Sequence, residues 1–198
     1  MQRLTERIMQ HAQGLPEGTP IAAKALLHLG SRAAVDQALS RLVRRGQLLR
    51  ASRGVYVRPV EARYGARAPS AEKVVEAIAR QRGESIASSG AAAANALGLT
   101  PQVPVRAVYL TSGPSRKLKL GAQVVEMKHA PHWQLVLANR PAGEAIRALA
   151  WVGPARANEA LRIIQRKLPE TELKEIVAAR AQLPSWIAER VSKLAAHG

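Results

Sequence analysis

One segment near the N-terminus constrains the fold of this chain more than any other. Residues 31–46, SRAAVDQALSRLVRRG, begin with a serine that can cap a helix and end at a glycine. Their apolar residues recur at helical spacing and form one stripe, which consists of Val35, Leu39 and Leu42. The pattern predicts an amphipathic helix. Residues 47–58 then predict a hairpin, with strands at 47–50 and 54–58 and a turn that contains Ser52, Arg53 and Gly54.

Two further helices are predicted before this segment. Leu4, Ile8 and Ala12 share one helical face, and residues 22–29 predict a short second helix that ends before Gly30. Three helices followed by a two-stranded hairpin are the elements of a winged helix-turn-helix, and we expect such a domain over residues 1–58.

The chain is expected to divide at residues 59–69, where proline, glycine and alternating arginine offer no regular apolar face. An arginine in this linker could contact phosphate or a minor groove, or could simply be solvated. The remaining residues, 70–198, predict two helices, then three strands between 105 and 129, then four helices between 144 and 195. The expected fold class is therefore α+β, a winged helix-turn-helix domain followed by a mixed helical domain with a small antiparallel sheet.

The charge of the chain predicts a polyanionic partner. The 198 residues contain 30 Lys and Arg against 14 Asp and Glu, a formal net charge of +16. Charge alone does not distinguish nucleic acid from an anionic membrane surface. The sequence has no apolar run of about 18 residues that could span a bilayer, and its N-terminus lacks the apolar core of a secretory signal. We therefore expect a cytoplasmic protein with no membrane partner.

The sequence offers little for catalysis. It has no cysteine, no phosphate-binding loop, no dinucleotide-binding glycine motif and no nucleophile elbow. Glu126, His129 and His132 are the only cluster typical of a metal site, but Pro131 prevents a helix from placing both histidines on one face. The hydroxyl-rich stretch 85–89 has no general base nearby in the sequence, which leaves open a base from elsewhere in the fold. We expect no enzyme, no metal and no cofactor.

The predicted interface with double-stranded DNA lies on the helix and the hairpin. Arginine can pair with guanine and glutamine with adenine, so Gln37 and Arg41 are the first candidates for reading bases and Arg32 is the third. Ser40 shares the exposed helix face. Residues expected to contact phosphate or the minor groove are Arg44, Arg45, Arg50, Ser52 and Arg53. Asp36 is the only aspartate and is expected to pair with Arg32 or Lys24.

A second basic cluster, Arg116, Lys117 and Lys119, lies on a predicted hairpin. Lys117 and Lys119 share one face of the strand, and Leu118 and Leu120 share the other. The cluster is a candidate for a second nucleic-acid contact. Surface lysines also occur on ordinary edge strands, where they prevent edge-to-edge pairing, so both interpretations stay open.

Two strings, VDQALSRLVRRGQLLRASRGVYVRP and the later YLTSGPSRKLKLGAQVVEMKHAP, resemble bacterial winged-helix regulators related to the AbiEi-type antitoxins of type IV toxin-antitoxin systems. The resemblance covers most of the chain. It implies that the N-terminal winged helix binds inverted repeats in its own promoter and that the C-terminal domain acts as an antitoxin. The implied functional partner is a nucleotidyltransferase-like toxin.

The sequence thus favours a sequence-specific DNA-binding transcriptional regulator, and the resemblance indicates an autoregulating antitoxin. Two alternatives remain. The first is a protein-interaction module with a basic localising domain, in which the C-terminal helices bind a partner through Trp151, Leu173, Ile176, Val177 and Trp186. The second is a protein that binds nucleic acid without sequence preference.

Overall fold

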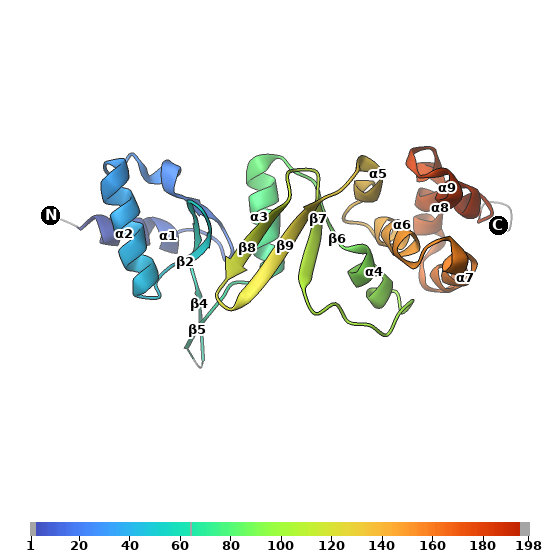
Figure 1. Cartoon of the computed structure of the whole chain (residues 1–198), viewed down its shortest axis with the longest axis horizontal. Helices are drawn as coiled ribbons and strands as arrows, with labels where there is room; N and C mark the ends of the chain where they lie inside the picture. The colour runs from blue at the N-terminus through green and yellow to red at the C-terminus, as the bar shows by residue number, and fades with distance from the viewer. Residues whose placement is uncertain (1–2, 64, 195–198) are drawn as a thin grey trace. The chain divides into compact units, whose positions relative to one another are not determined.

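The computed structural model describes residues 3–63 and 65–194 of the chain (Figure 1). It is an α+β protein with small antiparallel sheets, as the sequence predicted. The chain forms two compact units, each built from two separate segments. Unit 1 consists of Met1–Gly83 and Arg116–Met127, and unit 2 consists of Glu84–Ser115 and Lys128–Gly198.

The first part of unit 1 packs helices against a three-stranded antiparallel sheet. Its elements are α1 (Leu4–Gln13), β1 (Ile21–Ala22), the 3-10 turn η1 (Ala23–Leu26), α2 (Arg32–Arg44), β2 (Leu49–Ser52) and β3 (Val55–Val57). The strand order β1-β3-β2 brings a strand from before α2 beside the hairpin that follows it. A buried apolar cluster, here called the helical core, joins these elements and includes Ile8 of α1, Leu39 of α2 and Tyr56 of β3.

The first and third predicted helices are confirmed as α1 and α2, but the second is wrong. Residues 22–29 form only one 3-10 turn, η1, because the preceding residues are extended and pair with β3. Ile21 lies opposite Tyr56, and the Ala23 backbone N–H donates to the Gly54 carbonyl at 2.9 Å. This pairing joins segments far apart in the sequence, so the local apolar pattern does not reveal it.

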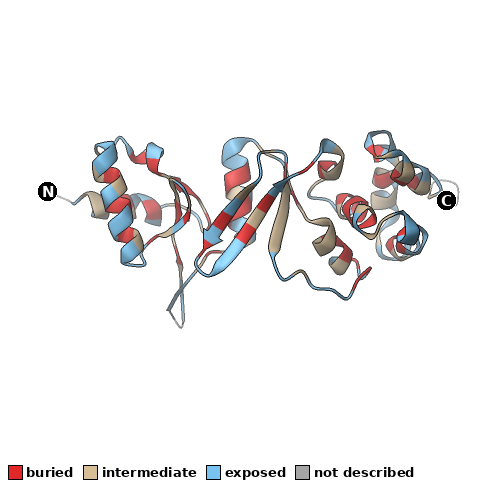
Figure 2. Cartoon of the chain, in the orientation of Figure 1, coloured by how far each residue is buried: buried red, intermediate tan, exposed pale blue. Residues whose placement is uncertain are grey.

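The predicted linker at 59–69 differs from the structure, because its middle forms a second hairpin within unit 1. Its strands are β4 (Val60–Ala62) and β5 (Gly65–Arg67), which pair antiparallel and are here called the arm. Pro59 and Pro69 are buried at the two ends of this segment, whereas five of the six strand residues are exposed and the sixth, Val60, is half-buried (Figure 2). The expected division at 59–69 therefore falls inside a compact unit.

Helix α3 (Ala71–Arg82) follows the arm, close to the predicted bounds, and a carboxylate holds its N-terminus. Glu17, from the loop after α1, accepts hydrogen bonds from the Ser70 backbone N–H at 3.2 Å and from Lys73 Nζ. The Arg67 guanidinium lies 3.8 Å from the same carboxylate. These contacts, with the Lys73 hydrogen bond as the largest cause, hold the pKa of Glu17 below its usual value.

A segment distant in the sequence completes unit 1. It contains β8 (Arg116–Leu120) and most of β9 (Gln123–His129), which form an antiparallel hairpin with Leu118 opposite Val125. Strand β8 lies against β2. Ala51 and Val57 of the first sheet are 2% and 0% exposed, although neither belongs to the helical core of the described residues. We infer that β8 covers the face of the first sheet that is turned away from the helices.

Unit 2 is mainly helical. Its elements are β6 (Ile86–Ser88), α4 (Gly90–Ala96), β7 (Ala107–Thr111), α5 (His132–Leu135), α6 (Pro141–Val152), the 3-10 turn η2 (Pro154–Arg156), α7 (Ala157–Lys167), α8 (Glu170–Ala178), the 3-10 turn η3 (Ala179–Gln182) and α9 (Ser185–Ser192). The two helices predicted after residue 70 are confirmed as α3 and α4. The four helices predicted between 144 and 195 are confirmed as α6, α7, α8 and α9, and residue 195 itself lies outside the described residues. Gly90 lets α4 approach α6, because a Cβ there would lie 2.8 Å from the Arg147 carbonyl oxygen.

The residues considered for a partner-binding face in unit 2 are mostly part of its core. Ile176 is fully buried in the apolar cluster of the unit, and Leu173 and Trp186 pack against that cluster. Val177 is half-buried, whereas Trp151 is 42% exposed. Packing in the core of unit 2 explains three of these five apolar residues, namely Leu173, Ile176 and Trp186, so few of the five are available to bind a partner.

Candidate nucleic-acid interface

Helix α2 is the central element of the predicted interface, and local interactions explain its limits. Ser31 caps the helix, since its Oγ accepts a hydrogen bond from the Ala34 backbone N–H at 3.3 Å. The stripe Val35, Leu39 and Leu42 is at most 1% exposed. The helix ends where Gly46 adopts φ of +70°, a left-handed conformation that favours glycine.

The opposite face of α2 is polar and exposed. Ser40 and Arg41 lie three and four residues after Gln37, and Arg44 lies four and three residues after them, which places all four on the same side of the helix. Arg32 in the first turn and Arg45 at the C-cap are exposed as well. All six residues that the sequence predicted for the helical part of the interface are therefore exposed, and they lie on α2 or at its C-cap.

Arg32 differs from the other arginines of α2 because it has an acidic partner. Its Nε lies 2.8 Å from Asp36 Oδ2, and both side chains are about half exposed or more. The predicted pairing of Asp36 with Arg32 is confirmed. An exposed ion pair of this kind adds little stability, but it fixes the guanidinium over the first turn and shields part of its charge.

The hairpin β2–β3 carries the remaining predicted residues. Gly54 adopts φ of +71° and allows a tight turn beside Arg53. The register shifts between Arg50 and Ser52, so Ala51 bulges inward and is 2% exposed. Arg50 and Arg53 are exposed and Ser52 is half-buried. The bulge keeps the basic side chains outside while the small residue packs.

The cations of this helix and hairpin have few internal partners. Within the described residues, no hydrogen bond or ion pair involves the side chains of Arg41, Arg44, Arg45, Arg50 and Arg53. Unit 1 contains 18 Lys and Arg against 7 Asp and Glu, a net charge of +11, while unit 2 contains 12 against 7, a net charge of +5. The positive potential is therefore concentrated on the unit that carries α2.

The second basic cluster also belongs to unit 1. On β8, Leu118 and Leu120 are buried and Lys117 and Lys119 are exposed, which confirms the predicted alternation. Lys117 Nζ lies 3.8 Å from Glu126 of β9. Arg116 is half-buried. This segment lies far from α2 in the sequence, and no local pattern indicates that the two belong to the same compact unit.

Among its described residues, unit 2 contains one buried cation. Arg147 of α6 is 2% exposed, and its guanidinium donates to the carbonyl of Ala138 at 3.0 Å and more weakly to that of Gln134 and to the Ser88 hydroxyl, both at 3.5 Å. Its Nε has no partner among the described residues. Burial lowers the pKa of Arg147 to about 10, and nearby Glu144 partly opposes that shift. Its contacts tie α6 to the residues around α5, which is a structural role.

The histidines noted in the sequence do not assemble a metal site in the described part of the chain. His129 Nδ1 lies 3.0 Å from the Gly113 carbonyl, and the His129 backbone N–H donates to Ser115 Oγ at 2.9 Å. In the described ranges, no three His, Asp or Glu side chains are grouped so that they could hold a metal ion. His129 instead links the end of β9 to the loop before β8.

The fold and its charge define an α+β protein whose unit 1 is strongly basic. The model of a family described as "Family of unknown function (DUF6088)" matches residues 7–176, and the chain belongs to that family. No curated protein matches the sequence.

A solved structure resembles the chain over nearly its whole length. It is that of the RV2827C protein from Mycobacterium tuberculosis, with a TM-score of 0.54 and 15% sequence identity over 98% of this chain and 76% of that chain. At this identity the similarity concerns the fold alone. In the described residues of our chain, no helix is both long and apolar enough to cross a membrane.

Proposed function

We propose that this protein is a sequence-specific, double-stranded DNA-binding transcriptional regulator whose N-terminal residues form a winged helix. The order α1, β1, η1, α2, β2, β3 and the strand order β1-β3-β2 support this assignment. In it α2 is the recognition helix, the β2–β3 hairpin is the wing, and η1 replaces the helix that normally precedes the recognition helix.

One observation carries the proposal: the exposed face of α2 and the adjacent hairpin both present arginines that have no partner inside the described protein. Stability does not require this arrangement, because like charges on neighbouring elements repel one another. Phosphate groups of DNA would relieve that repulsion and release counterions.

The residues divide by their place on these elements. Gln37 and Arg41 lie in the middle of the exposed face, where a helix in a major groove about 12 Å wide meets base edges. Arg32 is a weaker base reader, since Asp36 competes for its guanidinium. Ser40 lies between them. Arg44, Arg45, Arg50, Ser52 and Arg53 lie at the helix end and on the wing and contact phosphate or the minor groove.

The decisive experiment compares specific and random DNA. The full chain is used to select duplexes from a random library, and its affinities for the selected and a scrambled duplex are measured at one salt concentration. We expect a ratio of at least about 1,000. A ratio near one would overturn sequence-specific binding and favour a protein that binds nucleic acid without sequence preference.

We further propose that the regulator is the autoregulating antitoxin of a type IV toxin-antitoxin system and acts on an inverted repeat in its own promoter. The support for this step is the resemblance of the two sequence strings to AbiEi-type antitoxins. It is tested by asking whether the adjacent reading frame encodes a nucleotidyltransferase-like protein whose toxicity the full chain suppresses. An adjacent frame without such a toxin would remove the antitoxin role and leave DNA binding intact.

A further inference from the structure

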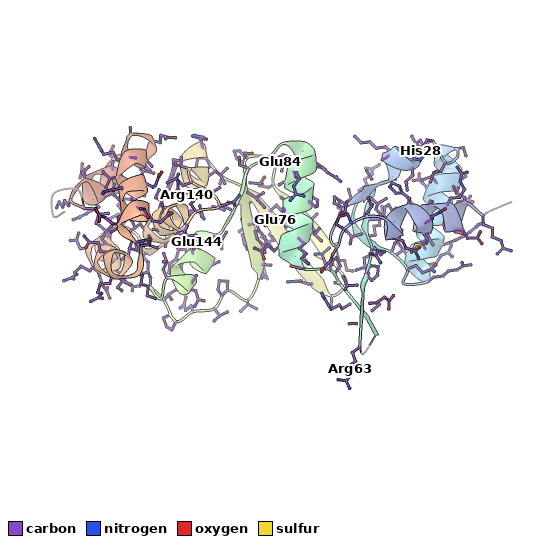
Figure 3. The ribbon with its side chains drawn as sticks, turned by 180° about the vertical axis from the view of Figure 1, so that it is seen from behind. His28, Arg63, Glu76, Glu84, Arg140 and Glu144 are labelled. Atoms are coloured by element: carbon purple, nitrogen blue, oxygen red, sulfur yellow. The ribbon has the colours of Figure 1, made fainter. Side chains whose placement is uncertain are left out.

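The arm formed by β4 and β5 is almost entirely exposed along its strands. Glu61, Ala62, Gly65, Ala66 and Arg67 are all exposed. A two-stranded ribbon that buries neither face is marginally stable by itself, so its order must come from its ends. Figure 3 shows Arg63 at the far end of the arm, away from the helices of unit 1.

The base of the arm is well anchored. Pro59 and Pro69 are buried on either side of it, and both restrict the backbone because proline fixes φ. Arg67 lies 3.8 Å from the Glu17 carboxylate, and its Nη1 donates to the Ala68 carbonyl at 3.1 Å. The arm is therefore an exposed ribbon that projects from a fixed base.

The two faces of the arm differ in charge and bulk. Val60 pairs with Arg67 and Ala62 with Gly65, so these four residues share one face, which has no acidic side chain. Glu61 pairs with Ala66 on the other face. The face that carries Val60, Ala62, Gly65 and Arg67 is narrow toward the tip, where Ala62 and Gly65 lie. It is basic at the base of the arm, where Arg67 lies.

The arm also has a defined place beside the recognition helix. Strand β3 runs away from the turn at Arg53, and its last residue, Val57, lies opposite Leu49 at the start of β2. The arm continues from this end of β3. It therefore leaves the sheet on the side where α2 ends, and Arg44 and Arg45 lie on the same side of unit 1.

We propose that the arm contacts the minor groove that flanks the DNA site of α2 on the side of the C-terminus of that helix; this inference rests on the proposed function. The minor groove is about 6 Å wide and attracts arginine where it is narrow, so a ribbon with small residues on one face and arginine at its tip fits it. Arg44 and Arg45 contact the phosphates between the two grooves, and Arg63 enters the minor groove.

Charge favours DNA over a second copy of the chain. The arm region carries Arg58, Arg63 and Arg67, while the acidic groups beside it are Glu61 and Glu17, which lies 3.8 Å from Arg67. The region therefore keeps a net positive charge, and two arms placed together would repel each other. An anionic groove is instead attracted by the positive charge that remains in this region. Self-association of the arms would therefore contradict the proposal, and the experiment below tests for it.

Methylation interference tests the two grooves separately, because dimethyl sulfate modifies guanine N7 in the major groove and adenine N3 in the minor groove. The experiment uses the full chain and a duplex selected from a random library, with the variant Arg63→Ala. Arg80→Ala is the control, since Arg80 is an exposed arginine on α3 of the same unit. For wild type we expect interference at guanine N7 inside the site and at adenine N3 in one flank.

Arg63→Ala should lose the adenine N3 interference, keep the guanine N7 pattern, bind about tenfold more weakly and lower the magnitude of the salt slope by about one. Arg80→Ala should behave as wild type.

Wild-type interference at guanine N7 without any at adenine N3 overturns the arm proposal and leaves the proposed function standing. Interference at neither position overturns the proposed function. Loss of a dimer in Arg63→Ala, with adenine N3 interference intact, assigns the arm to self-association and also overturns the proposal.

Discussion

Gln37 and Arg53 are both exposed and polar, but they are expected to contribute to binding in different ways. A phosphate contact is independent of sequence, so Arg53→Ala should weaken binding to selected and random duplexes equally and reduce the magnitude of the salt slope by about one. Gln37→Ala should cost about 1–3 kcal/mol on the selected duplex only and relax the preference at one base pair. Affinity titrations over a range of salt concentrations distinguish the two variants. An unchanged slope for Arg53→Ala, or equal losses on both duplexes for Gln37→Ala, would contradict the assignments.

Arg147 offers a test of what a buried cation contributes to unit 2. Within the part of the chain that the structure describes, its guanidinium has one short hydrogen bond, two long ones and no bond to a carboxylate, so its packing should matter as much as its charge. We expect Arg147→Ala to lower the free energy of unfolding by about 3 kcal/mol, because it leaves a cavity and an unpaired carbonyl at Ala138. Arg147→Met fills most of that volume and should lose about 1–2 kcal/mol.

Chemical denaturation of the two Arg147 variants and wild type measures both losses. Equal losses for Ala and Met would show that the hydrogen bonds, rather than the packing, account for the effect. DNA binding should be unchanged below the unfolding transition, since Arg147 belongs to unit 2 and α2 to unit 1.

At the scale of elements, Glu17 joins three parts of unit 1: the loop after α1, the base of the arm and the N-terminus of α3. The pKa of Glu17 is lower in the folded protein than its usual value of 4.5, chiefly because of the hydrogen bond from Lys73. A lowered folded pKa means that its stabilisation is fully present above pH 4.5 and is lost as the pH falls through the folded value.

Wild type should therefore have a higher unfolding temperature than Glu17→Gln near neutral pH, and the difference should shrink as the pH falls below the usual pKa of glutamate. Thermal unfolding followed by circular dichroism over a pH series measures this. Glu72→Gln is the matched control near neutral pH, because Glu72 is exposed on α3 and has no hydrogen bond or ion pair within the described residues, so this variant should unfold close to the wild-type temperature. A difference for Glu17→Gln that stays constant down to about pH 2 would show that ionisation of Glu17 is not responsible.

The elements that could be predicted from the sequence are those held by local interactions. The Ser31 cap, the stripe from Val35 to Leu42 and the turn glycine Gly54 define α2 and its hairpin within a few residues, and the polar positions of α2 are exposed as expected. Strand β1 and the arm were not predicted. Ile21–Ala22 becomes a strand only through its pairing with β3. The arm pairs two three-residue strands that are almost entirely exposed, so no alternation of buried and exposed residues reveals it.

At the scale of the whole molecule, the composition of the two units could not be predicted from the sequence. The alternation in β8 correctly indicates an apolar face at Leu118 and Leu120, but nothing local shows which sheet that face covers. The structure places this segment in unit 1, so residues 1–67 lack part of the unit. DNA-binding measurements therefore require the full chain.

This arrangement predicts that β8 stabilises the wing. Leu118 is 1% exposed, and its replacement by alanine should cost about 2–5 kcal/mol. Because β8 lies against β2, we expect Leu118→Ala to reduce hydrogen-exchange protection in β2 and β3 as well as in β8 and β9. Ile164→Ala, a control in the core of unit 2, should instead reduce protection around α6 and α7. If Leu118→Ala lowered protection in β8 and β9 while β2 and β3 kept theirs, the two hairpins would not form one cooperative unit, and the wing would be independent of the segment that covers it.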